Sequence, residues 1–348
     1  NDYDEIQNFL TQLAWAMYEK GAKNIEIGDL VAFNKRYSDE YYRKDLMPRL
    51  ALLERAKILV KTGDVYAFAY SYLDYFFVAK YLATHCNDQP ELQQRIKHLC
   101  NHLYLKENAN IVLFITYNLH ADWVIQEIAK VLNLILADIP PIQISTDANI
   151  LNTWITNQAK LVVDTTDMVA NNRKLKEADD NVAKRHPEPV HDQEVSSVSE
   201  LDQLAQINLL FKTCEILGHV LKGRYGSIRN QVKEDLMKRL FDAPLRGVNF
   251  FHQLINLEPE GVIKEVSQWL HKKHPKIDPE KAENVAKKFL FRIMGAIADS
   301  FFSRQGEIIG SAKLIETIDK VATSSGEVTY QIVGVASKLS IPNHAPTE

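Results

Sequence analysis

The sequence predicts a mainly α-helical protein in which a small module with a β-hairpin is followed by irregular multi-helix domains. The first observation is the order of elements in residues 1–85: helix, short strand, helices, hairpin and long helix. That order is typical of a winged-helix module, which reuses helix-turn-helix packing. The second is that apolar residues beyond Pro90 keep returning at helical spacing. With 348 residues, 46% hydrophobic and 25% charged, the chain can bury cores for two or three domains.

The elements of the first module follow from local patterns. Residues 5–21, "EIQNFLTQLAWAMYEKG", carry apolar side chains at helical spacing and end at a glycine. We expect "NIEIGDL" to be extended, and "DLVAFNKRY" and "EYYRKDLMPRLALLERAKIL" to be helices. In "LVKTGDVYAFA", apolar residues flank the turn-forming "TGD", which predicts a hairpin.

The stretch "YAFAYSYLDYFFVAKYLATH", residues 66–85, contains eight aromatic residues. It could form an aromatic cage for a cation, a membrane-seeking stripe, or a buried helix between domains. Cages rarely need so many rings along one helix, and a helix that is apolar nearly all round is normally buried on several sides. We therefore favour a strand end followed by a buried inter-domain helix, in which most side chains belong to the core.

The remaining chain divides by composition. Residues 86–170 read as a helical domain, and residues 171–200 are charged, proline-containing and poor in large apolar side chains, which predicts a linker or mobile loop. Residues 201–348 read as a C-terminal helical domain. Within it, "DPEKAE" predicts a helix start with Asp278 as N-cap and Pro279 in the first position.

Charge and cysteine content limit the class of protein. A net charge of -4 and a pI near 6.3 argue against a general nucleic-acid or anionic-membrane surface, while leaving room for a local basic patch. No uninterrupted apolar stretch reaches about 18 residues, so no membrane span is expected. Three scattered cysteines fit a reducing compartment, and we expect a cytoplasmic protein. The chain begins with Asn1, and we expect it to be a piece of a longer protein.

The sequence contains no readable catalytic motif. A P-loop, GxGxxG, GxSxG, HExxH and CxxC are all missing, which leaves a helical enzyme with an unrecognised site as the weakest alternative. No metal site is predicted. The candidates are a zinc site and a divalent-cation site, but the first lacks paired ligands and the second lacks the glycine turn and final glutamate of a calcium loop. Their residues are His85, Cys86, His98, Cys100 and His102 for zinc, and Asp164, Asp167, Asp179 and Asp180 for the other cation.

A small basic cluster lies at a helix junction in "LKGRYGSIRNQVK". Its members are Lys222, Arg224, Arg229 and Lys233. The cluster could bind a phosphate or an acidic partner, and its alternative is a solvated helix face. We keep the four residues as candidates for partner or phosphate binding.

Two stretches resemble one family. "YAFAYSYLDYFFVAKYL" is similar to the end of the winged-helix region of STAND-class, NACHT-type signalling NTPases, where an aromatic strand end precedes a helix of the type F-x-[HY]-x-x-[FYL]-x-[EY]-[FY]-[FL]-[VA]-A. Residues 68–79 fill those places. "KTCEILGHVLKGRYGSIRNQVKEDLMKRL" resembles the helical C-terminal region of bacterial members. The chain therefore looks like the winged-helix and sensor part of such an NTPase.

The resemblance implies a function and partners. It implies an upstream ATPase domain of the same protein, to which ATP or ADP and Mg²⁺ would bind, with no cofactor in this chain itself. It implies nucleotide-controlled oligomerisation, a protein trigger and effector activation, often in antiphage defence. In many NACHT relatives a winged-helix histidine contacts ADP, and Tyr70 occupies that place here. A tyrosine can donate a hydrogen bond to phosphate but cannot become positively charged.

A second function remains open. A winged helix could bind DNA as a transcriptional regulator, which requires an exposed basic recognition helix. The segment "YYRKDLMPRLALLERAKIL" offers basic residues for that role, namely Arg43, Lys44, Arg49, Arg55 and Lys57.

Overall fold

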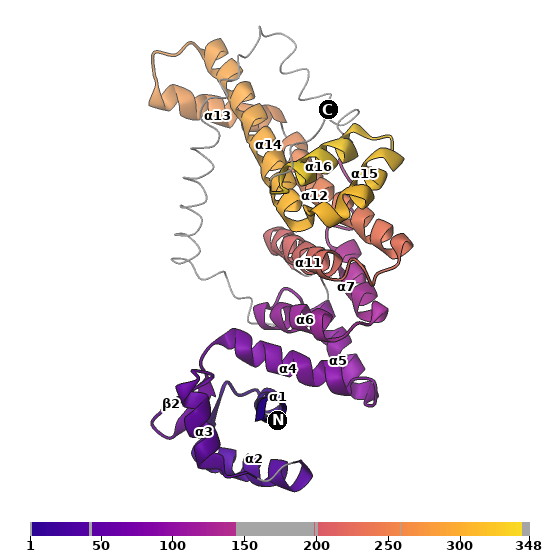
Figure 1. Ribbon diagram of the computed structural model, residues 1–348. Helices are drawn as coiled ribbons and strands as arrows, with labels where there is room; N and C mark the ends of the chain where they lie inside the picture. Colours follow the sequence, from indigo (N-terminus) through magenta and orange to yellow (C-terminus); the bar gives the residue numbers. More distant parts are fainter. Residues whose placement is uncertain (1, 42–43, 144–197, 199–200, 258, 343–348) are drawn as a thin grey trace. The chain divides into compact units, whose positions relative to one another are not determined.

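A computed structural model describes residues 2–41, 44–143, 198, 201–257 and 259–342 of the chain (Figure 1). The chain is mainly α-helical, as the sequence predicts. It divides into two compact units, Asn1–Val131 (unit 1) and Leu132–Glu348 (unit 2). The boundary predicted after residue 85 therefore falls inside unit 1. None of the described helices combines the length and the apolar character needed to cross a membrane.

Unit 1 combines a small sheet with several helices. Its helices are α1 (Asp2–Glu19), α2 (Ile27–Glu40), α3 (Leu46–Arg55), α4 (Ser71–His85), α5 (Pro90–Asn101), α6 (Lys106–Asn118) and α7 (Asp122–Leu134), the last of which ends in unit 2. Its strands are β1 (Asn24–Glu26), β2 (Leu59–Thr62) and β3 (Val65–Phe68). They form an antiparallel sheet in the order β1-β3-β2.

The predicted hairpin is confirmed. Thr62 of β2 pairs with Val65 of β3, so the turn between them consists of two residues. Gly63 adopts a φ of +63°, a conformation that side chains with a Cβ rarely adopt. Ile27 donates its backbone N–H to Asp64 O at 2.9 Å, which links the start of α2 to this turn.

Two helix boundaries differ from the prediction. The extended piece expected over residues 24–30 ends at Glu26, because α2 begins two residues before the expected start at Asp29. The prediction of one helix over residues 40–59 is wrong, because Tyr41 leaves helical geometry and α3 begins at Leu46. Pro48 is tolerated in the first turn of α3 because its missing N–H is not needed there.

The core of unit 1 lies where α1 meets α2 and α3. Phe9 contacts the edges of two α2 rings, Phe33 at 5.5 Å and Tyr37 at 5.3 Å between centroids. Such edge-to-face pairs add to the stabilisation from burial. Buried leucines surround these rings, and they are Leu10, Leu13, Leu30, Leu50 and Leu53.

Helix α4 is a buried helix, as the sequence predicts, but it lies inside unit 1. It packs on α1 and α6. On the α1 side Tyr81 stacks on Trp15 with centroids 4.5 Å apart, and on the other side Phe76 meets Phe114 of α6 edge-on at 5.6 Å. Tyr72 is an exception to the predicted core, because 55% of it is exposed.

Unit 2 is built around one long helix. Its helices are α11 (Gln203–Gly223), α12 (Asn230–Leu257), α13 (Pro259–Lys273), α14 (Pro279–Ile309), the 3-10 turn η2 (Ala312–Leu314), α15 (Ile315–Ser324) and α16 (Val328–Leu339). Helix α14 packs on α11, α12, α13 and α16. Asp278 caps it as predicted, since its carboxylate accepts from the N–H groups of Glu280 and Lys281.

Glycines allow close helix crossings in unit 2. A Cβ at Gly218 of α11 would lie 2.5 Å from Cγ2 of Ile308, and one at Gly247 of α12 would overlap the Phe301 ring. Both partners belong to α14. The backbones of α11 and α12 can therefore approach α14 only because these two positions carry no side chain.

Candidate functional site

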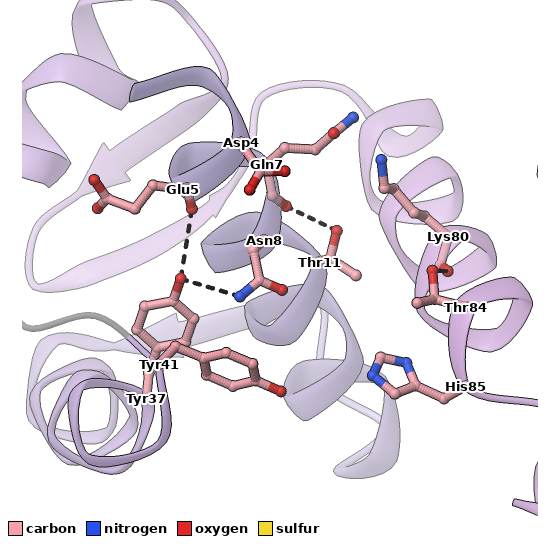
Figure 2. A pocket seen from close by; sticks show the side chains of 10 residues that line it. All are labelled: Asp4, Glu5, Gln7, Asn8, Thr11, Tyr37, Tyr41, Lys80, Thr84 and His85. Atoms are coloured by element: carbon pink, nitrogen blue, oxygen red, sulfur yellow. Dashed lines mark hydrogen bonds between the residues drawn. The ribbon is translucent and has the colours of Figure 1, made fainter. Parts of the chain in front are cut away.

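A polar groove of about 600 Å³ lies on unit 1 between α1, the end of α2 and the end of α4 (Figure 2). Helix α1 contributes one wall and α4 the facing one, with Tyr37 of α2 and Tyr41, the residue after α2, between them. The lining residues are Asp4, Glu5, Gln7, Asn8, Thr11, Tyr37, Tyr41, Lys80, Thr84 and His85. This groove could not be predicted from the sequence, because its residues come from three separate stretches with no common motif.

Tyr37 forms the inner end of the groove. Its hydroxyl accepts from Nδ2 of Asn8 at 3.3 Å and donates to the backbone carbonyl of Glu5 at 3.5 Å (Figure 2). Burial raises the pKa of Tyr37, and the bond from Asn8 only partly opposes that shift. The phenol therefore stays protonated and fixed against α1.

The wall formed by α4 carries a cation and an imidazole. Nδ1 of His85 lies 2.9 Å from the carbonyl oxygen of Tyr81. Because a carbonyl can only accept, Nδ1 carries the proton and Nε2 is left for the groove. Figure 2 shows the rings of His85 and Tyr41 extending toward one another from opposite sides. The groove thus offers donors and acceptors on both walls.

A buried arginine supports the groove from behind. Arg49 is only 2% exposed and donates to Oε1 of Glu5 at 2.6 Å and to Oδ1 of Asn34 at 2.8 Å. Its guanidinium lies 4.3 Å from the centroid of the Phe9 ring. The expectation that Arg49 belongs to an exposed basic helix is wrong, because its charge is used inside the module.

Lys44 of that predicted basic helix also pairs within the module, because it donates to Oε2 of Glu5 at 3.2 Å. Arg43 lies outside the described residues. Among the described basic residues of this segment, Arg55 and Lys57 are the two that are exposed and not paired with a carboxylate. The geometry therefore does not favour the DNA-binding alternative.

Glu5 should make the stability of unit 1 depend on acid pH. Burial raises its pKa, but hydrogen bonds and charge from Arg49 and Lys44 outweigh burial, so the pKa is lowered on balance. Its contribution is therefore complete above the unfolded pKa of about 4.5 and is lost as pH falls through the lower folded value. Urea unfolding between about pH 3 and pH 6 should show that the unfolding free energy of the wild type falls with pH, and that it falls less in Glu5→Gln. An equal dependence of the unfolding free energy on pH in the two proteins would contradict this role of Glu5.

Tyr70 lies at the opposite end of α4 from the groove. It is the extended residue before the first turn of α4, and 52% of it is exposed. Its ring stacks on that of Tyr72 with centroids 5.5 Å apart. Two neighbouring phenols are thus presented at the junction of β3 and α4, where a partner could reach them.

A lysine joins the sheet to two helices near that junction. Lys23, just before β1, donates to Asp74 of α4 at 3.2 Å and to Glu107 of α6 at 2.5 Å. Burial raises the pKa of Asp74, and Lys23 opposes that shift. Burial lowers the pKa of Lys23, but the two carboxylates raise it by more. The ammonium remains charged and bridges three elements.

Two lysines of the predicted basic cluster in unit 2, Lys222 and Lys233, bond to groups of the protein itself. Lys233 is buried, donates to the carbonyl of Tyr225 at 3.1 Å and lies 3.9 Å from the centroid of its ring. Lys222 donates to the carbonyl of Glu307 at 2.7 Å. Arg224 is buried, and Arg229 is exposed. Binding of a phosphate or an acidic partner by this cluster stays a prediction.

The zinc candidates are not brought together. Cys86 and Cys100 are buried, and burial raises the pKa of both thiols. His98 stacks on His102 at 4.1 Å, whereas His85 stacks on Tyr81. In the part of the chain that the structure describes, no three His, Cys, Asp or Glu side chains are grouped as metal ligands.

The predicted linker, residues 171–200, lies outside the described residues apart from Val198. So do four aspartates considered for a divalent cation, namely Asp164, Asp167, Asp179 and Asp180.

Comparison with known protein families gives a match over part of unit 1. Residues 23–78 match the family Novel STAND NTPase 4. The matched segment runs from the lysine before β1 through the sheet and into the first half of α4, and it includes Tyr70 and Tyr72. This supports a relation to STAND-type NTPases. No curated protein and no solved structure matches the chain.

Proposed function

We propose that this chain is the regulatory and sensor part of a STAND-type NTPase of the NACHT kind. The observation that carries the proposal is the family match over residues 23–78, which covers the sheet and the start of α4. The order of elements, α1-β1-α2-α3-β2-β3, supports a winged-helix module for this part. The ATPase region would belong to another part of the same protein and would bind ATP or ADP with Mg²⁺.

In this proposal the winged-helix module holds the ATPase region in its inactive state. Tyr70 is suited to contact bound ADP, because its phenol is exposed within the matched segment and a hydroxyl can donate to a phosphate oxygen. Its stacking on Tyr72 limits the directions in which that hydroxyl can point. Such a contact would be present with ADP bound and lost when the module moves away.

The helices of unit 2 would recognise a protein trigger, and trigger binding would release the ATPase for oligomerisation and effector activation in the cytoplasm, in defence against phage. To convert a population from about 1:99 to 99:1, the trigger must favour the active state by about 5.5 kcal/mol. A surface made of many helices provides room for a contact of that size, since α11 to α16 together form unit 2.

Tyr70 provides the test. In the full-length protein, Tyr70→Ala is expected to lower the amount of ADP that copurifies with the protein, and Tyr70→Phe should lower it by nearly as much if the hydroxyl makes the contact. One neutral hydrogen bond corresponds to about 0.5–1.5 kcal/mol, or roughly a 2- to 12-fold weaker affinity. Bound nucleotide would be released by denaturation and quantified by chromatography.

Tyr117→Ala is the matched control, because Tyr117 is a similarly exposed tyrosine of unit 1 on α6. It should leave ADP retention unchanged. The proposal as a whole also requires a P-loop and a Walker B carboxylate elsewhere in the full-length sequence. Their absence there would reject it, whereas unchanged retention in Tyr70→Ala would reject only the role of Tyr70.

A further inference from the structure

Helices α13 and α14 form a helical hairpin (Figure 1). Its two edges carry different side chains. Its own small core consists of Ile263, Ala286 and Leu290, with Val262, Val266 and Leu270 packed against it. One edge is a groove of about 560 Å³, lined by Lys264 and Gln268 of α13 and by Glu283 and Lys287 of α14, among others. The opposite edge carries a different set of side chains.

Helical periodicity identifies that second edge. At 3.6 residues per turn, Trp269 and Lys273 project from the side of α13 opposite Lys264 and Gln268. By the same reasoning Phe289 projects from the side of α14 opposite Glu283 and Lys287. Beside Phe289 lies a stripe of three cations at spacings of seven and four residues, namely Lys281, Lys288 and Arg292. We call this set the basic–aromatic edge: Trp269, Lys273, Lys281, Lys288, Phe289 and Arg292.

The side chains of this edge are available to a partner. Trp269 is 56% exposed and Phe289 is 50% exposed. Lys273 lies 5.4 Å from the centroid of the Trp269 ring. Within the described residues, no carboxylate pairs with the three cations of the α14 stripe, whereas Lys287 on the other edge is held by Glu283 at 2.6 Å. Both the rings and the charges therefore face solvent.

The arrangement selects the kind of ligand. From Lys281 to Arg292 the stripe extends over about 16 Å at 1.5 Å per residue. A single phosphate or carboxylate needs cations that converge on one point, so an elongated polyanion fits better. Exposed aromatic rings beside such a row are the features on which successive bases of a single strand stack. An acidic peptide would use the cations but leave both rings in water.

A membrane surface fits this hairpin less well. Amphipathic elements that enter a bilayer interface bury an apolar face. The end of this hairpin is residues 271–276, "HKKHPK", which are all exposed and, apart from Pro275, polar. If the hairpin approached a membrane with this end, charged side chains would meet the surface, while Trp269 and Phe289 would stay on the side of the hairpin.

We propose that the basic–aromatic edge binds single-stranded nucleic acid. The ammonium and guanidinium groups contact phosphates, while Trp269 and Phe289 provide surfaces for base stacking. The acidic net charge of the whole chain, -4, confines this property to a local patch. The inference is independent of the proposed NTPase function.

The first test measures the electrostatic part. Fluorescence polarisation of a labelled oligothymidylate or oligouridylate of about 20 nucleotides is followed with the full chain while KCl is raised from about 50 mM. Four phosphate contacts predict a slope of log K against log [KCl] of about −2.8. Lys288→Gln/Arg292→Gln should reduce the magnitude of that slope by about 1.4. The control Lys264→Gln/Lys287→Gln removes the same charge from the other edge and should leave it unchanged.

The second test measures stacking. Trp269→Ala is expected to weaken binding by about 5- to 150-fold, whereas Trp269→Phe keeps a ring and should retain most of the affinity. Absence of binding at about 50 mM KCl would overturn the proposal, and so would equal losses of affinity in the two double variants that remove charge. Stronger binding to a duplex, to poly-glutamate or to phosphatidylserine vesicles than to the single strand would overturn it as well.

Discussion

Arg246→Met is expected to lower the free energy of unfolding of unit 2 by about 3–5 kcal/mol, a large part of the 5–15 kcal/mol typical of a domain. Arg246 is 8% exposed. Its guanidinium donates to the carbonyl oxygens of Leu132 at 2.8 Å, Asn133 at 3.3 Å and Ile135 at 2.8 Å. These carbonyls end α7, where no further helical N–H can reach them, so methionine would leave them buried without donors.

The effect should be local as well as large. Hydrogen exchange followed by mass spectrometry should show faster exchange around the end of α7 in Arg246→Met, together with a lower urea midpoint. Lys238→Met removes an exposed cation from the same helix, α12, and should change neither quantity. Equal exchange rates and equal urea midpoints in the two variants would mean that Arg246 does not stabilise the end of α7.

Arg49→Met is expected to destabilise unit 1 by a similar amount, about 3–5 kcal/mol. The substitution keeps much of the volume against Phe9 but removes the buried one of the two cations that pair with Glu5, whose side chain is only 15% exposed, and leaves it with Lys44 alone. A carboxylate held in that position without its guanidinium must either stay poorly paired or take up a proton. The decrease should appear as a lower urea midpoint near neutral pH.

A double-mutant cycle separates the pair from the packing. Arg49→Met/Glu5→Gln should recover a substantial part of the loss, because it removes the unpaired charge along with the guanidinium. Arg55→Met changes an exposed arginine of the same helix and should be close to neutral. A cycle with no coupling between Arg49 and Glu5 would disprove the importance of this ion pair.

The predictable part of the fold follows from strong local signals. The turn at Gly63 and the cap at Asp278 depend on neighbouring residues, and both were located correctly from the sequence. The boundary near Tyr41 was missed because "EYYRKDLMPRL" has good helical periodicity right through the break. Local preference was overridden there by the need for α3 to turn back against α1.

The site was harder to predict for a different reason. Arg49 looks like one cation among several on a helix, and only the fold shows that Glu5, forty-four positions earlier, lies beside it. The groove likewise combines residues that are distant along the chain, from Asp4 to His85. The aromatic helix α4 was recognisable because its burial follows from its own composition, whereas the exposure of Tyr72 depends on where its neighbours end.

The bridge made by Lys23 has a mechanical consequence. One ammonium holds carboxylates from α4 and α6 while its backbone leads directly into β1. Twisting the sheet against these helices would separate opposite charges that are partly shielded from water, which is costly compared with bending a loop. Lys23 therefore opposes movement of the sheet relative to both helices through one side chain.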